Sequence, residues 1–462
     1  MGSLKPIQKA DLFLVAMKLV TYALIMATFF LAMSINNWQI LQPSRTMAIT
    51  GMTFLSMVYV MNSVYGGYAV GKKKSKPVIS SLSLSIIITD LVAYVQLQIM
   101  NVNPDNNAYL MLFGSDLLYL FFAMIIQVGL IVFLVRLGNN TYFRIVPPRP
   151  SCIIVGSAAD VESILKKIDK FKLQFTICDV VPCSLSNIHT VIERNKTVFL
   201  CGVPEEQRNT LILTCYRLKK NIMCLAELED IMLSNAKQTI LVDVPFLEME
   251  YRAMSLSQRI AKRALDIFVA GVGLVLASPV MLIAAIAIKI GDGGPVFFRQ
   301  DRMTDHGKIF KLIKFRSMKV GAEKLNMSAA EADERITPVG DVLRRYRLDE
   351  LPQLFNVLHG EMAIVGPRPE MLPNVEKYKK ELPSFTYRER VKAGLTGYAQ
   401  IEGKYNTSPK DKLMLDLMYI ESFSLWLDVK LIFRTLTVFF RRESTEGFVT
   451  PVSKDENQSA QG

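Results

Sequence analysis

Histidine and cysteine are too sparse and too poorly spaced in this sequence to build the usual metal or triad chemistry. Only three histidines occur, His189, His306 and His359, and they lie far apart in the chain. A zinc centre or a histidine-based catalytic triad is therefore not expected. All six cysteines fall between Cys152 and Cys224, and none forms a C-x-x-C pair that would chelate zinc or exchange disulfides. We predict reduced, buried thiols in a cytosolic domain.

A cleavable signal peptide is missing as well. The N-terminal segment MGSLKPIQKADLFL leads into an apolar run that is too long for a signal sequence and has no small-residue cleavage site behind it. This pattern predicts a membrane anchor that is retained.

The chain is too apolar for a wholly water-soluble protein. Its 462 residues allow about three folding units, since domains average roughly 150 residues. Half of the residues are hydrophobic and the mean hydropathy is +0.26, so part of the chain is expected to lie in lipid. The 54 Lys and Arg outnumber the 42 Asp and Glu, which favours an anionic partner. With so many apolar residues, a phosphorylated substrate or a membrane surface is favoured over nucleic acid.

Four segments are long and apolar enough to cross a bilayer, which needs about 20 residues. They are 11–33, 47–66, 80–100 and 109–135. The basic loop 71–76 predicts a cytoplasmic location, whereas 101–107 has no Lys or Arg and predicts an external one. By the same rule the N-terminus and everything after the fourth segment face the cytoplasm. Three ionisable residues fall within the segments, where a functional role is the alternative and snorkelling or pairing between helices is favoured, and we propose no ion pathway: Lys18, Asp90 and Asp116.

From residue 147 to about 250 short β-branched runs alternate with helical stretches. The runs are CIIVG, FTICDVV, TVFLCGV, NIMCLA and TILVDV, the last at 239–244. Such alternation predicts a small parallel α/β sheet of the nucleotide-binding type. The turn after the first run, VGSAAD, has the single glycine Gly156 where a dinucleotide site needs three. A structural or regulatory module is favoured, and a residual ligand site is the alternative.

A long apolar segment opens the last third of the chain. Residues 265–290 follow the basic amphipathic stretch 251–264 and contain Ser278 and Pro279 near their middle. Proline bends a helix, and basic residues at both ends predict that both ends face the cytoplasm. We therefore expect a re-entrant helix that bends at Ser278 and Pro279, with a crossing helix as the alternative.

Two clusters in the last third suit phosphate chemistry. In the run KFRSM, Lys314 and Arg316 lie two apart and point to one side if the segment is extended, as phosphate ligands or as a solvated basic face. In LRRYRLDELPQLF, Arg344 precedes Asp349 and Glu350. Asp349 could cap the following helix, but an ionised aspartate beside cations is also a plausible nucleophile toward phosphorus. Glu350 could hold Mg²⁺.

A second arginine is presented from a stiff turn. The sequence Gly366-Pro367-Arg368-Pro369-Glu370 places one arginine between two prolines. Because proline fixes the backbone, this arrangement is unusual for a plain surface loop.

Together these motifs resemble the bacterial polyprenyl-phosphate phosphoglycosyl transferases, the sugar transferases that initiate exopolysaccharide, capsule and O-antigen synthesis. The resemblance covers about 251–442 and includes the Ser-Pro helix, KFRSM, LDELPQLFNVLHGEM, VGPRPE, AGLTGYAQIEGK and LDLMYIESFSLWLDVKLIFRT. The parts before residue 251 are similar to the extension of the larger family members by pattern only. Two departures occur: Arg347 replaces a frequent serine, and Ala393 with Tyr398 replaces proline and tryptophan, which could loosen a loop over the site.

The resemblance implies a role for each motif residue. Asp349 would attack the sugar-linked phosphate of a UDP-sugar, releasing UMP, and a polyprenyl (undecaprenyl) phosphate would then take the phosphosugar. Glu350 would assist, with Mg²⁺ as cofactor. The substrate-binding residues would be Lys314, Arg316, Arg344 and Arg368.

The sequence thus predicts a membrane protein with α and α/β parts. Its domains would be a four-helix transmembrane domain (1–146), a Rossmann-like α/β domain (147–250) and a phosphoglycosyl transferase domain (251–462) with a re-entrant helix at 265–290. The implied partners are a UDP-sugar, undecaprenyl phosphate and the bilayer. Nucleic acid is not an expected partner, and a homodimer is compatible with this prediction. The catalytic domain would lie on the cytoplasmic face of the inner (plasma) membrane.

Three rival functions stay open, one of which is a non-catalytic membrane scaffold or regulator that would show no turnover. A Leloir-type glycosyltransferase would release UDP, but it commonly holds its metal with a D-x-D pair, and no two aspartates here are two apart. An NAD-dependent nucleotide-sugar dehydratase or epimerase would need more glycine in VGSAAD. The identity of the sugar is not readable from these motifs.

Overall fold

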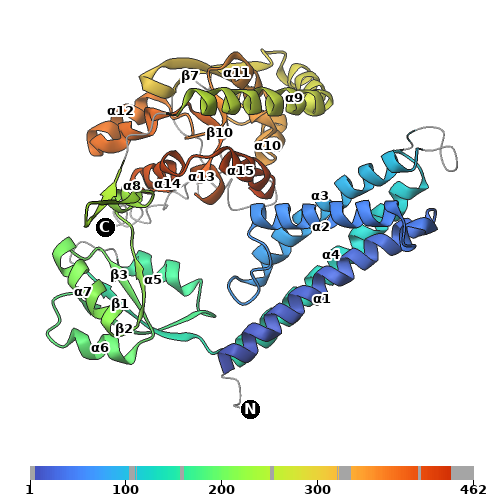
Figure 1. Ribbon diagram of the computed structural model, residues 1–462. Coiled ribbons are helices and arrows are strands. Elements are labelled where there is room, and N and C mark those ends of the chain that lie inside the picture. Colours follow the sequence, from blue (N-terminus) through green and yellow to red (C-terminus); the bar gives the residue numbers. More distant parts are fainter. Residues whose placement is uncertain are drawn as a thin grey trace, which may run out of the picture. The chain divides into compact units, whose positions relative to one another are not determined.

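The computed structural model describes residues 6–102, 110, 112–156, 161–249, 254–319, 321, 335–403 and 407–438. The chain divides into two compact units, residues 1–227 and 228–462. The first unit contains an apolar helical part and a parallel α/β part, and the second contains the motif residues (Figure 1). The division into three domains stays a prediction.

Apolar helices form the first part of unit 1. They are α1 (Pro6–Ser34), α2 (Arg45–Tyr65), α3 (Ser75–Met100) and α4 (Ser115–Ile145), and they pack around a common buried cluster that includes Phe29, Phe54 and Ile131. Counting α9 of unit 2, five described helices are long and apolar enough to cross a membrane. These helices agree with a membrane protein, while the number of helices that cross stays a prediction.

The fourth helix differs from its predicted span. It begins at Ser115 rather than 109 and continues ten residues beyond 135. Much of the predicted external loop, 103–107, lies outside the described residues. Both acids are paired: the half-buried Asp116 accepts from Asn36, in the turn after α1, and from Gln98 of α3 at 2.6 and 2.8 Å, and the buried Asp90 of α3 accepts from Gln127 of α4 at 3.4 Å. For these acids the contacts agree with interhelical pairing.

The α/β part contains the predicted parallel sheet. Its strands are β1 (Arg149–Val155), β2 (Phe175–Pro182), β3 (Thr197–Cys201) and β4 (Asn221–Cys224), in the order β2-β1-β3-β4. Helices α6 (Ile188–Arg194) and α7 (Glu205–Arg217) cover one face, and α5 (Val161–Asp169) covers the other. Gly156 is needed where β1 and β3 end, because a Cβ there would lie 1.7 Å from the Gly202 carbonyl oxygen.

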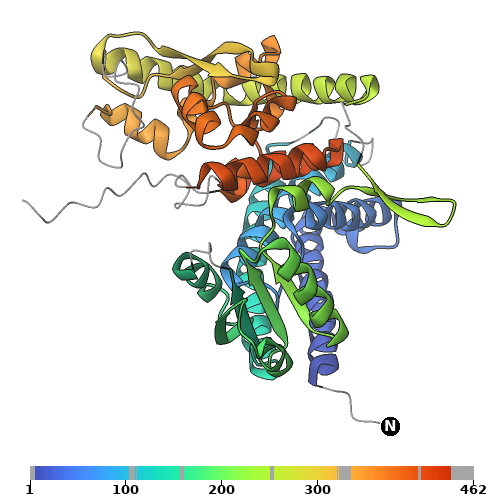
Figure 2. The same ribbon diagram turned by 90° about the vertical axis from the view of Figure 1, so that its left-hand side faces the viewer.

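Two predictions for this region are wrong. The run 239–244 is not a fifth parallel strand: β5 (Lys237–Leu241) and β6 (Val244–Glu248) form a separate antiparallel hairpin, visible as a two-stranded ribbon in Figure 2. A connection of two residues allows only antiparallel pairing. The second wrong prediction is that all the thiols are buried. Cys178 and Cys224 are exposed, because β2 and β4 are the edge strands of the sheet.

Unit 2 is built around α9 (Leu256–Asp292). Before α9 lies α8 (Leu228–Leu233), and after it the antiparallel pair β7 (Phe297–Met303) and β8 (Ile309–Phe315). Then follow the helices α10 (Pro338–Arg345), α11 (Gln353–His359), α12 (Leu372–Glu381), α13 (Tyr398–Glu402), α14 (Pro409–Glu421) and α15 (Leu425–Val438). Strands β9 (Ala363–Val365) and β10 (Gly394–Thr396) pair in parallel. The core joins residues of α9, β8, α11, β9, α14 and α15.

Helix α9 is continuous through the predicted bend. A capping box of Ser255 and Gln258 starts it, and Pro279 lies inside it. Proline cannot donate a hydrogen bond to the carbonyl four residues earlier, that of Val275. The Ser278 hydroxyl donates to this carbonyl at 2.7 Å, so the adjacent serine satisfies the group that the proline leaves without its helical partner. The re-entrant course of α9 stays a prediction.

Candidate active site

Asp349 lies in a short connection between two helices. Helix α10 ends at Arg345, the backbone turns through Arg347 with a φ of 54°, and the 3-10 helix η4 (Leu348–Glu350) follows. Helix α11 begins three residues after η4 ends, and its N-cap is Pro352, without a side-chain hydrogen bond. Asp349 therefore does not cap α11, and the helix-cap alternative is excluded.

Glu350 is the centre of a cluster of charges. Its Oε1 accepts a hydrogen bond from Nη2 of Arg368 at 2.8 Å and lies 3.4 Å from Nζ of Lys314. Burial alone would raise the pKa of Glu350. The positive charges of Arg368, Lys314 and Arg347 outweigh burial and hold that pKa well below its usual range. This environment favours the ionised form of Glu350.

Asp349 has the opposite environment. Burial raises its pKa above the ordinary 3.8, and the negative charge of Glu350 raises it further, while Lys314 and Arg344 act in the other direction. Among the residues that the structure describes, none donates a hydrogen bond to the Asp349 carboxylate. A carboxylate that is poorly solvated and not held by hydrogen bonds is the more nucleophilic member of the pair.

The basic residues exceed the acidic pair. At least five cations act on Asp349 and Glu350, namely Lys314, Arg302, Arg344, Arg347 and Arg368. The positive charges around the pair outnumber its two negative ones, which favours an anionic ligand such as a diphosphate. Nη1 of Arg344 is buried and has no hydrogen-bond partner within the described ranges, and 41% of the Arg368 side chain is exposed. Both guanidinium groups can therefore take a further acceptor.

Arg316 has contacts that differ from those of Lys314. Lys314 lies in β8 opposite Phe298, whereas Arg316 follows the strand and packs against Gly294, just after α9. A Cβ on Gly294 would lie 1.8 Å from the Arg316 guanidinium, so a larger residue there would require the arginine side chain to shift. The structure brings Lys314, Arg344, Arg368, Asp349 and Glu350 together, and a substrate role for Arg316 stays a prediction.

The membrane helix holds the strand that leads into the Gly-Pro-Arg-Pro turn. Lys262 of α9 and Tyr419 of α14 donate to the Val365 carbonyl at 3.1 and 3.2 Å. Both also donate to Asp428, at 2.7 and 2.9 Å, so these buried groups satisfy one another. In addition, Asp266 accepts the amide of Ile364 at 2.9 Å. This network fixes the end of β9.

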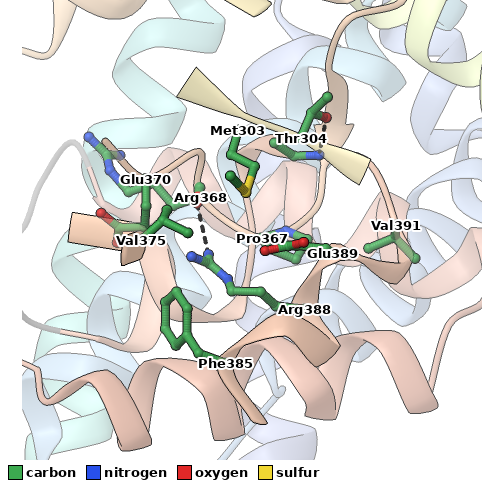
Figure 3. Close-up of a pocket in the computed structure, with 11 residues that line it drawn as sticks. Met303, Thr304, Pro367, Arg368, Glu370, Val375, Phe385, Arg388, Glu389 and Val391 are labelled. Carbon is green, nitrogen blue, oxygen red and sulfur yellow. Dashed lines mark hydrogen bonds between the residues drawn. The ribbon is translucent and has the colours of Figure 1, made fainter. Parts of the chain in front are cut away.

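Beyond β9 the turn is held at three successive residues. Arg388 donates to the carbonyl of Arg368 at 2.8 Å, Arg302 donates to that of Pro369 at 3.1 Å, and Lys412 lies 3.4 Å from Glu370. A small cavity of about 20 Å³ lies beside these groups, and Figure 3 shows Arg368, Arg388 and Phe385 around it. Its volume suits one or two waters rather than a nucleotide.

Ala393 ties down the loop that was expected to be looser than in the family. Its amide donates to Thr304 Oγ1 at 3.1 Å, a bond that proline could not make. The next residue, Gly394, is so close to Gly366 that a Cβ on it would lie 2.0 Å from the Gly366 amide nitrogen. The residue in place of proline therefore adds a hydrogen bond to a closely packed loop.

The donor set fits a magnesium ion only together with a substrate. Within the part of the chain that the structure describes, no three His, Cys, Asp or Glu side chains form a metal site. Mg²⁺ is, however, commonly held by one or two carboxylates and by substrate phosphates. Asp349 and Glu350 can supply those carboxylates, and a diphosphate would have to supply other ligands.

Sequence reasoning overlooked the residues that hold the turn. Asp416 lies in the motif LDLMYIESFSLWLDVKLIFRT, but no spacing along the chain links it to Arg388, Arg302 or Lys412, and these four residues meet only in the folded chain. Burial raises the pKa of Asp416 to about 6, although Arg388 lies 2.8 Å away and lowers it. A buried acid and base of this kind leave no local signal in the sequence.

Comparison with known proteins covers the second unit. The family model described as bacterial sugar transferase matches residues 257–442. The chain is 42% identical over 179 residues to the UDP-N-acetylgalactosamine-undecaprenyl-phosphate N-acetylgalactosaminephosphotransferase of Aeromonas hydrophila, which is 38% of this chain and 42% of that protein. It is 44% identical over 202 residues to the UDP-glucose:undecaprenyl-phosphate glucose-1-phosphate transferase of Escherichia coli K12. The aligned residues cover 42% of this chain and 43% of that protein.

A third relative is covered over more of its length. The UDP-glucose:undecaprenyl-phosphate glucose-1-phosphate transferase of Caulobacter vibrioides is 39% identical over 181 residues, which is 38% of this chain and 68% of that protein. The aligned part of this chain spans less than half the length of the first two relatives.

Proposed function

The chain belongs to the bacterial sugar transferase family, and from this membership we propose that it transfers a sugar-1-phosphate from a UDP-sugar to undecaprenyl phosphate. The products are undecaprenyl-diphosphate-sugar and UMP, the first membrane intermediate in the synthesis of an exopolysaccharide, capsule or O-antigen. One observation supports this function above the others: a partly buried Asp-Glu pair surrounded by more numerous cations, an arrangement that suits a diphosphate. The rival dehydratase and Leloir activities have no comparable support.

The transfer proceeds in two displacements at phosphorus. A carboxylate oxygen of Asp349 attacks the sugar-linked phosphorus, and the bond from that phosphorus to the bridging oxygen breaks, so that UMP leaves with the bridging oxygen. A phosphate oxygen of the lipid then attacks the same phosphorus and breaks the bond to Asp349, which restores the carboxylate. Splitting the reaction in this way lets one group serve a soluble donor and a lipid acceptor in turn.

The surrounding side chains balance charge and bind phosphate, and they take no part in making or breaking bonds. Glu350 stays ionised and holds Arg368 and Lys314 beside Asp349, so the cations are already placed when the diphosphate arrives. Arg344 and Arg368 take the phosphate oxygens. Asp349 and Glu350 would hold Mg²⁺ together with the diphosphate, and the ion would supply positive charge to offset the negative charge of the phosphate groups.

The membrane arrangement follows from charge and helix length. Helix α9 enters the bilayer from the cytoplasm, bends near Ser278 and Pro279, and returns on the same side, so that the site lies at the depth of the lipid phosphate. The enzyme is then a multi-pass protein of the inner membrane with a cytoplasmic catalytic unit. Which sugar it accepts depends on loops around the site rather than on the motif.

Asp349→Asn tests the proposal. The amide keeps the size of the side chain but is a poor attacker at phosphorus, so we expect a protein that inserts and melts like the parent and loses nearly all UMP release. Incubated with a UDP-sugar and no lipid, the parent should gain the mass of a phosphosugar and the variant should not. The assay uses full-length protein in detergent with undecaprenyl phosphate and a panel of UDP-sugars.

A matched control lies eight residues earlier. Asp341 pairs with Arg345 on the surface of α10, and Asp341→Asn should keep the parental rate. Substantial UMP release by Asp349→Asn would refute the nucleophile and favour direct attack by the lipid phosphate. Release of UDP instead of UMP by the parent would refute the phosphosugar transfer itself.

A further inference from the structure

A buried ion pair lies behind the turn that presents Arg368. Arg388 and Asp416 have side chains only 7% and 1% exposed, and their charged atoms are 2.8 Å apart. Arg388 belongs to the 3-10 helix η5 (Pro383–Arg390), whereas Asp416 belongs to α14. Neither residue has a role in the two displacements described above.

Arg388 connects this pair to the backbone of the turn. The same Nη2 atom that contacts Asp416 donates to the main-chain carbonyl of Arg368 at 2.8 Å (Figure 3). The guanidinium also lies over the ring of Phe385, 4.9 Å from its centre, and Phe385 is itself fully buried. Three contacts therefore fix the Arg388 guanidinium: the Asp416 carboxylate, the Phe385 ring and the Arg368 carbonyl.

The side chain of Arg368 is held much less firmly than its backbone. It is 41% exposed and pairs with Glu350 through one nitrogen. A long, partly exposed side chain has many conformations, so the position of its Cα and carbonyl decides how often the guanidinium meets Glu350 and the diphosphate.

We propose that Arg388 is a positioning residue for Arg368: through the Arg368 carbonyl, and braced by Asp416, it sets where the phosphate-binding guanidinium lies. This inference rests on the proposed function, because it assigns Arg388 to the binding of the UDP-sugar diphosphate. It adds a residue from a different segment to the site, 20 positions beyond Arg368 and without a contact to substrate.

The test replaces the pair as a unit, since removing one partner would leave a buried charge and destabilise the fold. Arg388→Met combined with Asp416→Leu substitutes apolar side chains of similar size and deletes the donor to the Arg368 carbonyl. We expect a melting temperature close to that of the parent and a kcat/KM for UDP-sugar lowered about 5- to 20-fold, less than for loss of a direct charged contact.

The decisive measurement is the coupling to Arg368. In an Arg368→Ala background the same double substitution should change kcat/KM by less than about twofold, because the group that Arg388 positions is gone. A merely structural pair would lower activity by the same factor in both backgrounds, and that result would overturn the proposal. So would an unchanged kcat/KM in the parental background.

Two further variants complete the experiment. Arg390 and Glu421 form a similar ion pair from the same two elements, with side chains 22% and 15% exposed, so Arg390→Met with Glu421→Leu is the matched control and should stay within about twofold of the parent. If the Arg388 double variant melts below the assay temperature, Arg388→Lys takes its place. Lysine keeps the positive charge beside Asp416 but lacks the planar guanidinium that donates to two acceptors. This variant must show the same dependence on Arg368. A parent without UMP release would refute the proposed function, whereas an active parent with uncoupled variants would refute only the role of Arg388.

Discussion

The contact between Arg368 and Glu350 allows the phosphate-binding role of the Gly-Pro-Arg-Pro turn to be tested quantitatively. In the substitution Arg368→Ala, the guanidinium that donates to Glu350 at 2.8 Å is lost, and with it the exposed part of the side chain that can reach a ligand. The prolines on either side stay, so the backbone of the turn should keep its course. The substitution thus separates the side chain from the turn.

The expected loss follows from the number and kind of contacts. A charged hydrogen bond is worth roughly 1.5–3 kcal/mol, which corresponds to a fall in kcat/KM on the order of 10- to 150-fold. The stability should change much less. Lys314 remains 3.4 Å from Glu350, and a pair in which one side chain is 41% exposed contributes about 1 kcal/mol or less to the free energy of unfolding.

The assay measures UMP release against UDP-sugar concentration, together with the melting temperature of each variant. Arg345→Ala is the control, because Arg345 is an exposed arginine of α10 that pairs with Asp341 rather than with Glu350. It should keep kcat/KM within about twofold of the parent. If Arg368→Ala also changes kcat/KM by less than about twofold, Arg368 only shapes the turn, and the argument from its contacts is refuted.

Three further predictions follow from the site and the helices. The pKa of Asp349 is raised while that of Glu350 is depressed, so the fall of kcat/KM toward acid pH should reflect protonation of Asp349 and lie above pH 3.8. In Arg368→Ala this fall should move to higher pH, because a cation that favours the ionised form of Asp349 is lost. An unchanged position of the fall would contradict this assignment. Chelation with EDTA should abolish UMP release, restored by Mg²⁺, without lowering the melting temperature, because within the described residues no three-ligand site is present to stabilise the fold. A membrane-impermeant thiol reagent applied outside the cell should label Gln42→Cys but not Lys377→Cys, and labelling of the second would show that α9 crosses the bilayer.

Local properties of the sequence sufficed for the apolar helices and the parallel sheet. Hydropathy over about 20 residues marks a helix that can lie in lipid, because the bilayer acts on each segment through its length and composition alone. The alternation of β-branched runs and helical stretches likewise predicted the sheet that β1 to β4 form. The same rule failed at 239–244, where a turn of two residues, not the composition of the run, decides how the strand pairs.

The Asp-Glu pair and the Gly-Pro-Arg-Pro turn were recognisable as motifs, but their environment was not. Propensity alone favoured a helix cap for Asp349, and only the observed start of α11 at Gln353 excluded it. Opposite pKa shifts of two adjacent carboxyls depend on which charges the fold brings near each of them. These charges come from β8, α10 and the turn after β9.

The tertiary structure alone decided which side chains meet. Lys314 and Arg368 reach Glu350 from positions 36 and 18 residues away, and Arg388 and Asp416 come together from different helices behind the turn. Periodicity and spacing describe neighbours along the chain, whereas these contacts are set by how the core packs α9, β9 and α14. Short sequence motifs therefore identify the chemical groups of this site, and the packing of the core determines where these groups lie.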